Sequence, residues 1–117
     1  MSSEKRDFDP SILWEQVGED LETFEAILMV FKKNLPSHLE KLNQAISKND
    51  FSLLKLEAHS MKGELGNLGA VEGAEIAKKI EALAAQAQIT DVQTLVSELM
   101  DTLKPITDYI DSKKRPI

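Results

Sequence analysis

The chain has 117 residues, of which 42% are hydrophobic and 29% are charged, a size and composition typical of one folded domain. Its net charge of −6 disfavours nucleic acid or an anionic membrane surface as the main partner, and the absence of cysteine excludes disulfides, cysteine nucleophiles and thiolate metal sites. The longest apolar run, at 26–31, is far shorter than the roughly 20 residues that span a bilayer, and no signal-peptide pattern follows Met1, so we expect a cytoplasmic protein. The start at Met1 favours a free-standing protein, and the alternative of a segment cut from a larger protein stays open.

Helical periodicity dominates the first half of the chain. Asp9-Pro10 has the pattern of a helix start and predicts a short helix that ends at about Val17. A long helix is predicted from Asp20, with Pro36 as a kink within it. Its apolar positions recur every three or four residues, at Leu21, Phe24, Leu28, Phe31, Leu35, Leu39, Leu42 and Ile46.

Three further helices are predicted in the second half. One begins at Asp50, carries His59 and ends near Gly69. The next covers about 70–88, and the last begins at about Asp91. The inward positions expected in these last two helices are Ile76, Ala77, Ile80, Leu83, Ala84 and Ala87, and then Val92, Leu95, Val96, Leu99, Leu103, Ile106 and Ile110.

Four amphipathic helices joined by short connections predict an all-α fold. We expect an antiparallel up-down four-helix bundle, with the short N-terminal helix covering one end. The bundle would form a single unit over residues 1–117, with a core from about 10 to 112 and flexible ends that include three basic residues at 113–115.

His59 is the centre of the candidate site. At about 100° per residue, Lys55, Lys62, Gly63 and Gly66 fall on the same side of the helix as His59. The apolar residues of this helix fall on the opposite side, at Leu54, Ala58, Met61, Leu65 and Leu68. Glycine within a helix costs about 1 kcal/mol relative to alanine, so two glycines beside an exposed histidine need an explanation. We interpret them as room for a bulky group to approach His59.

The residue types on this face favour phosphoryl chemistry. A solvent-facing imidazole is a nucleophile that can accept an electrophilic group such as phosphoryl. Lys62, one turn from His59, would offset the negative charge gained, and Lys55 adds positive potential on the same face. The pattern therefore predicts a phosphoryl-acceptor site on a chain that is acidic overall.

Residues 58–63, Ala-His-Ser-Met-Lys-Gly, and 67–70, Asn-Leu-Gly-Ala, resemble the signature of histidine-containing phosphotransfer (HPt) domains. The family pattern is Ala-His-x-Leu-Lys-Gly followed by Leu-Gly-Ala, and the resemblance extends over roughly residues 10–105. It implies that His59 is phosphorylated, that Lys62 neutralises the phosphoryl group, and that Gly63 gives a receiver domain access to the ring.

The resemblance also implies partners. Phosphoryl groups would pass between His59 and an aspartate of a response-regulator receiver domain in a two-component phosphorelay, and a hybrid sensor histidine kinase is a further expected partner. Lys55, Gly63 and Gly66 would lie in the docking surface. The receiver would supply Mg²⁺, and this chain would bind no metal or other cofactor, have no ATP site, and act as a monomeric phosphocarrier rather than an enzyme.

The chain departs from the family pattern at Glu64-Leu65, where two small residues are usual. Leu65 falls on the apolar face and Glu64 points away from His59. We therefore expect this difference to alter packing or partner choice and to leave the chemistry intact.

Other interpretations remain open at this stage. A non-catalytic helical adaptor could bind a signalling partner through the His59 face, whereas an enzyme with His59 as general base would lack a second catalytic group there. His38 has no base, metal partner or glycine beside it, so we expect a surface residue. We expect no zinc site, because the chain has 2 histidines and no cysteine and because Glu57 and Glu64 do not share the His59 face.

Overall fold

The computed structural model describes residues 8–112, within which it contains five α-helices and no strands. The helices are α1 (Pro10–Gln16), α2 (Leu21–Lys48), α3 (Phe51–Asn67), α4 (Val71–Ala85) and α5 (Val92–Ser112). The predicted flexible ends fall mainly on residues 1–7 and 113–117, which lie outside the described residues.

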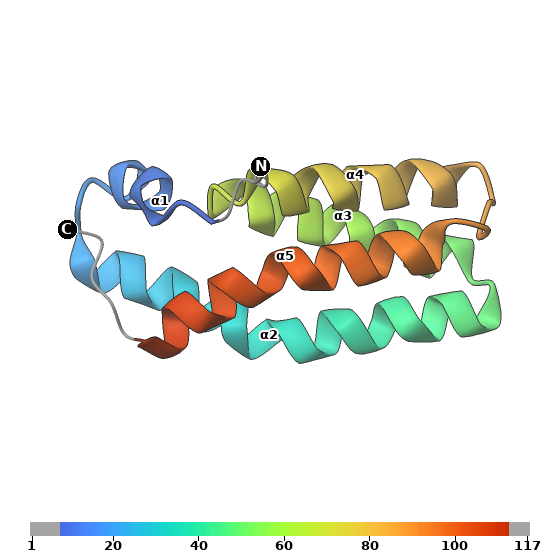
Figure 1. Cartoon of the computed structure of the whole chain (residues 1–117), viewed down its shortest axis with the longest axis horizontal. Coiled ribbons are helices and arrows are strands. Elements are labelled where there is room, and N and C mark those ends of the chain that lie inside the picture. The colour runs from blue at the N-terminus through green and yellow to red at the C-terminus, as the bar shows by residue number, and fades with distance from the viewer. Residues whose placement is uncertain (1–7, 113–117) are drawn as a thin grey trace, which may run out of the picture.

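Helices α2 to α5 form a four-helix bundle in which successive helices run in opposite directions (Figure 1). Helix α3 packs against both α2 and α4, α4 contacts α5, and α5 contacts α2, which closes the bundle. Short α1 lies at the end of the bundle where α3 turns into α4 (Figure 1). The predicted all-α antiparallel bundle with a short extra N-terminal helix is confirmed.

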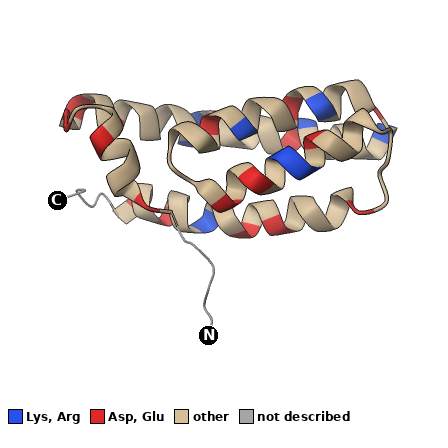
Figure 2. Cartoon of the chain, turned by 90° about the horizontal axis from the view of Figure 1, so that it is seen from above, with Lys and Arg blue, Asp and Glu red and all other residues tan. Residues whose placement is uncertain are grey.

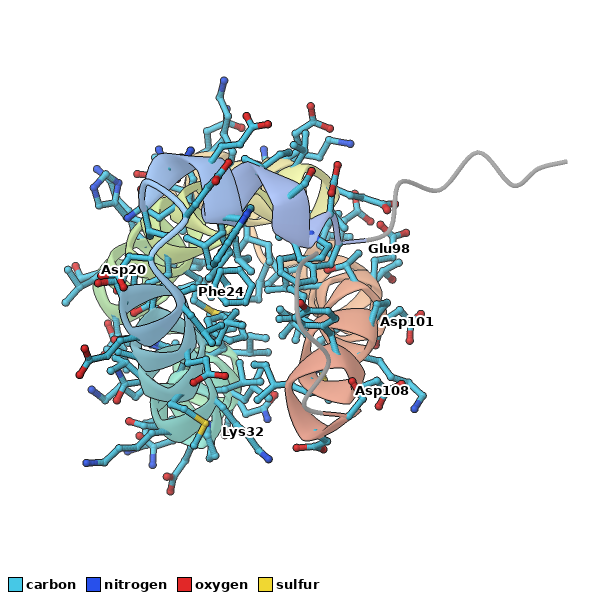
Figure 3. All side chains as sticks on the ribbon, turned by 90° about the vertical axis from the view of Figure 1, so that its left-hand side faces the viewer. Asp20, Phe24, Lys32, Glu98, Asp101 and Asp108 are labelled. Atoms are coloured by element: carbon cyan, nitrogen blue, oxygen red, sulfur yellow. The ribbon has the colours of Figure 1, made fainter. Side chains whose placement is uncertain are left out.

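The apolar stripes predicted for the helices form the core. Viewed along the bundle, Phe24 points inward between the helices, whereas Glu98 and Asp101 lie on the outer side of α5 (Figure 3). The ring of Trp14 meets that of Phe24 edge-on, with centroids 5.6 Å apart, and so attaches α1 to the bundle end. The fully buried side chains include Leu42, Leu54, Met61, Leu65, Ile80, Leu99 and Ile106.

The first four helices end in the same way. Each is followed by a residue in the left-handed conformation: Gly18 (φ 68°), Asn49 (φ 53°), Gly69 (φ 78°) and Ala87 (φ 55°). The next amide then donates to the carbonyl five residues back, as Asp50 N does to Ala45 O at 2.8 Å. Glycine and asparagine adopt this conformation readily and alanine does not, so the end of α4 was predicted wrongly. The helix ends at Ala85 instead of about 88, and Ala87, expected to face inward, is exposed.

Gly69 also determines how closely α1 packs. A Cβ atom added at residue 69 would lie 2.7 Å from Ile12 Cβ and 2.8 Å from Ile12 Cγ2. Helix α1 can therefore approach the turn between α3 and α4 this closely only because residue 69 has no side chain.

The two prolines within helices do not end them. Helix α2 continues through Pro36, and α5 continues through Pro105.

Acidic and basic residues are interspersed along the outer faces of the bundle (Figure 2). In the part of the chain that the structure describes, no helix is both long and apolar enough to span a membrane.

Candidate functional site

His59 lies in the middle of α3 with its ring directed away from the core. Its side chain is 65% exposed, whereas Ala58 and Met61 on the opposite side are each 1% exposed. The helix begins after Asp50, whose carboxylate accepts a hydrogen bond from the Leu53 amide at 3.0 Å. The burial of the apolar stripe fixes the rotation of α3 and so turns His59 outward, as predicted.

A carboxylate from the neighbouring helix completes the site. Glu81 of α4 accepts hydrogen bonds from His59 Nδ1 at 2.9 Å and from Lys62 Nζ at 2.8 Å. Sequence reasoning missed Glu81, because no spacing rule connects residues on two helices. The position of Glu81 could have indicated its role, because Glu81 follows buried Ala77 by one turn and so lies at the edge of the inward stripe of α4.

The protonation state of this pair follows from its geometry. The hydrogen bond from Lys62, assisted by the one from His59, holds the pKa of Glu81 below its usual value although burial opposes this. An ionised carboxylate can only accept hydrogen bonds, so Nδ1 of His59 carries the proton. In the neutral form of the ring, the lone pair then lies on the other nitrogen, Nε2.

Lys62 lies beside His59, as predicted, but its ammonium group is not free in solvent. The side chain is 33% exposed and paired with Glu81. Glu81 therefore holds the imidazole and the ammonium group together before any anion arrives.

Gly63 and Gly66 are both exposed on the face of α3 that carries His59. A Cβ atom at either position would meet nothing within 4 Å. No contact within the described residues therefore accounts for these two helical glycines, which cost stability. The space beside both glycines is open.

A shallow hollow surrounds the histidine. It has a volume of about 400 Å³ and is lined by Ser52, Lys55, Leu56, His59 and Glu81. Leu56 is 62% exposed, so the hollow offers an apolar contact beside the basic group of Lys55 and the imidazole of His59. Lys55 lies on the His59 face of the helix, as the sequence predicted, whereas Leu56 was not among the predicted site residues.

The prediction that His38 is a plain surface residue is wrong. Its side chain is only 13% exposed and lies between α2 and α3, where Nδ1 is 2.8 Å from Glu57 Oε1 and Nε2 is 3.1 Å from Glu64 Oε2. Glu57 and Glu64 are seven residues apart, two turns of α3, and so face α2 together. Burial opposes a charged ring, but the two carboxylates outweigh it and raise the pKa of His38.

Among residues 8–112, no group of three or more His, Asp or Glu side chains is arranged to hold a metal ion. Glu57 and Glu64 lie away from His59, as predicted, and on opposite sides of the His38 ring. The two histidines thus belong to separate clusters, one exposed and one between helices.

A family model described as the Hpt domain matches residues 26–108, from near the start of α2 to near the end of α5. The matched segment contains His59, Lys62, Gly63 and Glu81. Comparisons with curated proteins and with solved structures found no match. The family that residues 58–63 resemble is therefore confirmed over most of the chain.

Proposed function

The chain belongs to the Hpt domain family, whose members carry phosphoryl groups on a histidine in two-component phosphorelays, and we propose that His59 is that histidine. It would exchange a phosphoryl group with an aspartate of a receiver domain, as a cytoplasmic, monomeric phosphocarrier rather than an enzyme. The observation that carries the proposal is the hydrogen bond from His59 Nδ1 to Glu81, which leaves Nε2 of an exposed ring as the nucleophile.

In the proposed step, Nε2 attacks the phosphorus atom of the receiver's aspartyl phosphate. An N–P bond forms as the P–O bond to the aspartate breaks, and the aspartate leaves as a carboxylate, so no proton is transferred. The ring keeps its Nδ1 proton and becomes positively charged. Glu81 stabilises that charge through the 2.9 Å hydrogen bond, and the reverse step returns the phosphoryl group by the same route.

Lys62 would interact with the phosphoryl group after transfer. A phosphoryl group adds roughly two negative charges beside an ammonium group one helical turn away. In the unmodified protein Glu81 holds that ammonium group at 2.8 Å. Lys62 can then turn toward the phosphoryl oxygens, while Glu81 keeps its contact with His59.

The receiver would dock on the exposed strip of α3 that contains Lys55, Gly63 and Gly66. The two glycines leave the approach to the ring open, and exposed Leu56 offers an apolar contact beside it. We propose that the receiver supplies Mg²⁺ and the groups that stabilise the in-line transition state, while this chain positions the nucleophile. A hybrid sensor kinase would present the same chemistry through its own receiver domain.

The test is phosphoryl transfer from receiver domains that have been phosphorylated with acetyl phosphate and Mg²⁺. We expect acid-labile, base-stable phosphate on the wild-type chain and none on His59→Gln, with the same helical circular dichroism spectrum for both. An adaptor would bind the receiver in both forms and take up no phosphate. Label that persists in His59→Gln would reject the site, and no transfer from any receiver would reject the function.

A further inference from the structure

We propose that Glu64 determines partner specificity, by receiving a long basic side chain of the docking receiver in the apolar hollow between α2 and α3. The inference rests on the proposed function, because it concerns which receiver docks beside His59. It assigns a role to the position at which the sequence departs from its family.

The hollow has a volume of about 290 Å³. Its walls are mainly apolar, and they include Ala26, Ile27, Val30 and Phe31 from α2 and Glu64 and Asn67 from α3. Val30 is 56% exposed, so an apolar surface is open to solvent at this point. Among the described residues that line the hollow, Glu64 is the only charged one, and it is negative.

The Glu64 carboxylate is held in place but not fully satisfied. His38 bonds Oε2 at 3.1 Å, whereas Oε1 is buried with no hydrogen-bond partner among the described residues. A buried acceptor without a donor is costly, so a donor that reaches the Glu64 carboxylate on docking adds to the affinity. By contrast, the buried Glu57 carboxylate is bonded by His38 and lies 3.9 Å from Lys41 Nζ.

Charge complementarity identifies the occupant. A lysine or arginine side chain has an apolar stem that can cover the hydrophobic wall and a cationic end that can meet a carboxylate. An aliphatic side chain would bring no donor to the Glu64 carboxylate, and an acidic one would be repelled by it. The hollow therefore fits a basic side chain better than either.

The hollow is also within reach of a partner bound at His59. Asn67 on its rim follows exposed Gly66 and lies eight residues, about 12 Å along the helix, from His59. A specific interface covers about 800 Å² on each partner, so a receiver centred on His59 extends over this distance. Docking at the histidine and insertion into the hollow are therefore compatible.

The experiment follows single-turnover transfer to this protein from each receiver domain encoded in the same genome, and it gives the maximal rate constant (kcat) and the half-saturating receiver concentration (KM). Glu64→Gln keeps the shape of the side chain and removes its charge, and Glu64→Lys reverses the charge. For the preferred receivers we expect Glu64→Gln to raise KM about tenfold with kcat unchanged, and Glu64→Lys to raise it further. Changing the inserted basic residue of the receiver to glutamate should restore transfer to Glu64→Lys.

Glu57→Gln is the matched control, since it removes the other carboxylate bonded to His38 and leaves the lining of the hollow intact. Wild-type KM values in both Glu64 variants would overturn the inference. So would an equal change in receiver preference in Glu57→Gln, because the role of Glu64 would then be structural.

If no receiver transfers to the wild-type chain, the proposed function fails and a second measurement decides the inference. Butylguanidinium, a model of the arginine side chain, is titrated against neutral butylurea in amide NMR spectra. We expect saturable shifts of Val30 and Asn67 with the cation alone, and their loss in Glu64→Gln. Equal shifts with both compounds, or shifts that survive in Glu64→Gln, would overturn the inference.

Discussion

The pairing of His59 with Glu81 makes the two ring nitrogens unequal. Nδ1 donates to the carboxylate at 2.9 Å, and Nε2 faces solvent on a side chain that is 65% exposed. Without Glu81 either nitrogen could carry the proton, and only part of the population would present the reactive lone pair at Nε2. In the proposed function Glu81 is therefore a positioning residue, because it would act through His59.

Glu81→Ala is predicted to lower the rate of transfer to His59 about tenfold, the effect of losing one hydrogen bond to a charged group. Glu81→Gln should retain more activity, since its amide oxygen still accepts from Nδ1. The ¹⁵N shifts of the ring should show a mixture of tautomers in Glu81→Ala and mainly the Nδ1–H form in the wild type. Exposed Glu75 on the same helix gives the control, Glu75→Ala, and equal losses in both alanine variants would contradict the role.

His38 makes stability depend on pH. The ring is bonded to Glu57 and Glu64, with Lys41 near Glu57, and its pKa is raised above the value of about 6.5 in the unfolded chain. The stabilisation is therefore fully present below pH 6.5 and is lost as the pH rises through the native pKa.

We predict that His38→Gln lowers the free energy of unfolding more at pH 5.5 than at pH 8.5. Urea denaturation of the wild type and of His38→Gln between pH 5.5 and 8.5 measures the difference in their free energies of unfolding. The contributions of titratable groups that both proteins share cancel in this difference. A difference that stays constant, or one that grows with pH, would show that the charged ring does not stabilise the fold.

At the level of single helices, two glycines on the exposed face of α3 make this helix less stable than alanines would. Gly63 and Gly66 lie within a continuous helix whose opposite face is buried, and no neighbour occupies the space beside them. Gly63→Ala should therefore stabilise the protein by roughly 0.5–1 kcal/mol, the ordinary difference in helix propensity. Thermal unfolding checks this value, and a loss of stability would show that an internal contact requires glycine.

A large side chain at residue 63 should slow phosphoryl transfer to His59. Gly63→Leu is predicted to keep the helical circular dichroism of the wild type and to slow transfer to His59 on the order of a hundredfold, because the receiver is displaced from the ring. Stopped-flow or quenched transfer assays measure the rate. Unchanged transfer would remove the steric role assigned to the glycine.

The junction between α1 and the bundle depends on one glycine. Gly69→Ala combines positive φ with a clash against Ile12 and should cost roughly 2–4 kcal/mol. Gly18→Ala is the matched control, with positive φ but open space, and should cost roughly 1–2 kcal/mol. Equal costs by urea denaturation would show that the contact with α1 contributes nothing.

For the molecule as a whole, the features that were predictable are those encoded within one helix. The spacing of apolar residues identified the buried stripes, and Asp9, Asp50 and the glycines at 18 and 69 marked helix ends correctly. The exposed face of α3 followed from the same periodicity. Because the buried stripe of a helix determines its rotation, the position of His59 could be predicted before any tertiary contact was known.

The features that were not predictable depend on contacts between helices or on strain. Glu81 reaches His59 across 22 residues of sequence, and His38 meets Glu57 and Glu64 across 19 and 26 residues. Ala87 takes a left-handed conformation that its own preference opposes, so the end of α4 is imposed by the turn that follows it. Helical periodicity carries no information about such pairs.

The most direct test of the account is the location of the phosphoryl group after transfer. The protein, labelled with ¹⁵N-histidine, is phosphorylated by a receiver domain and Mg²⁺, and its ring nitrogens are read by ¹H–¹⁵N multiple-bond NMR. We predict phosphorylation at Nε2 of His59, with Nδ1 still protonated and His38 unchanged. Phosphorylation at Nδ1, or on His38, would contradict the account.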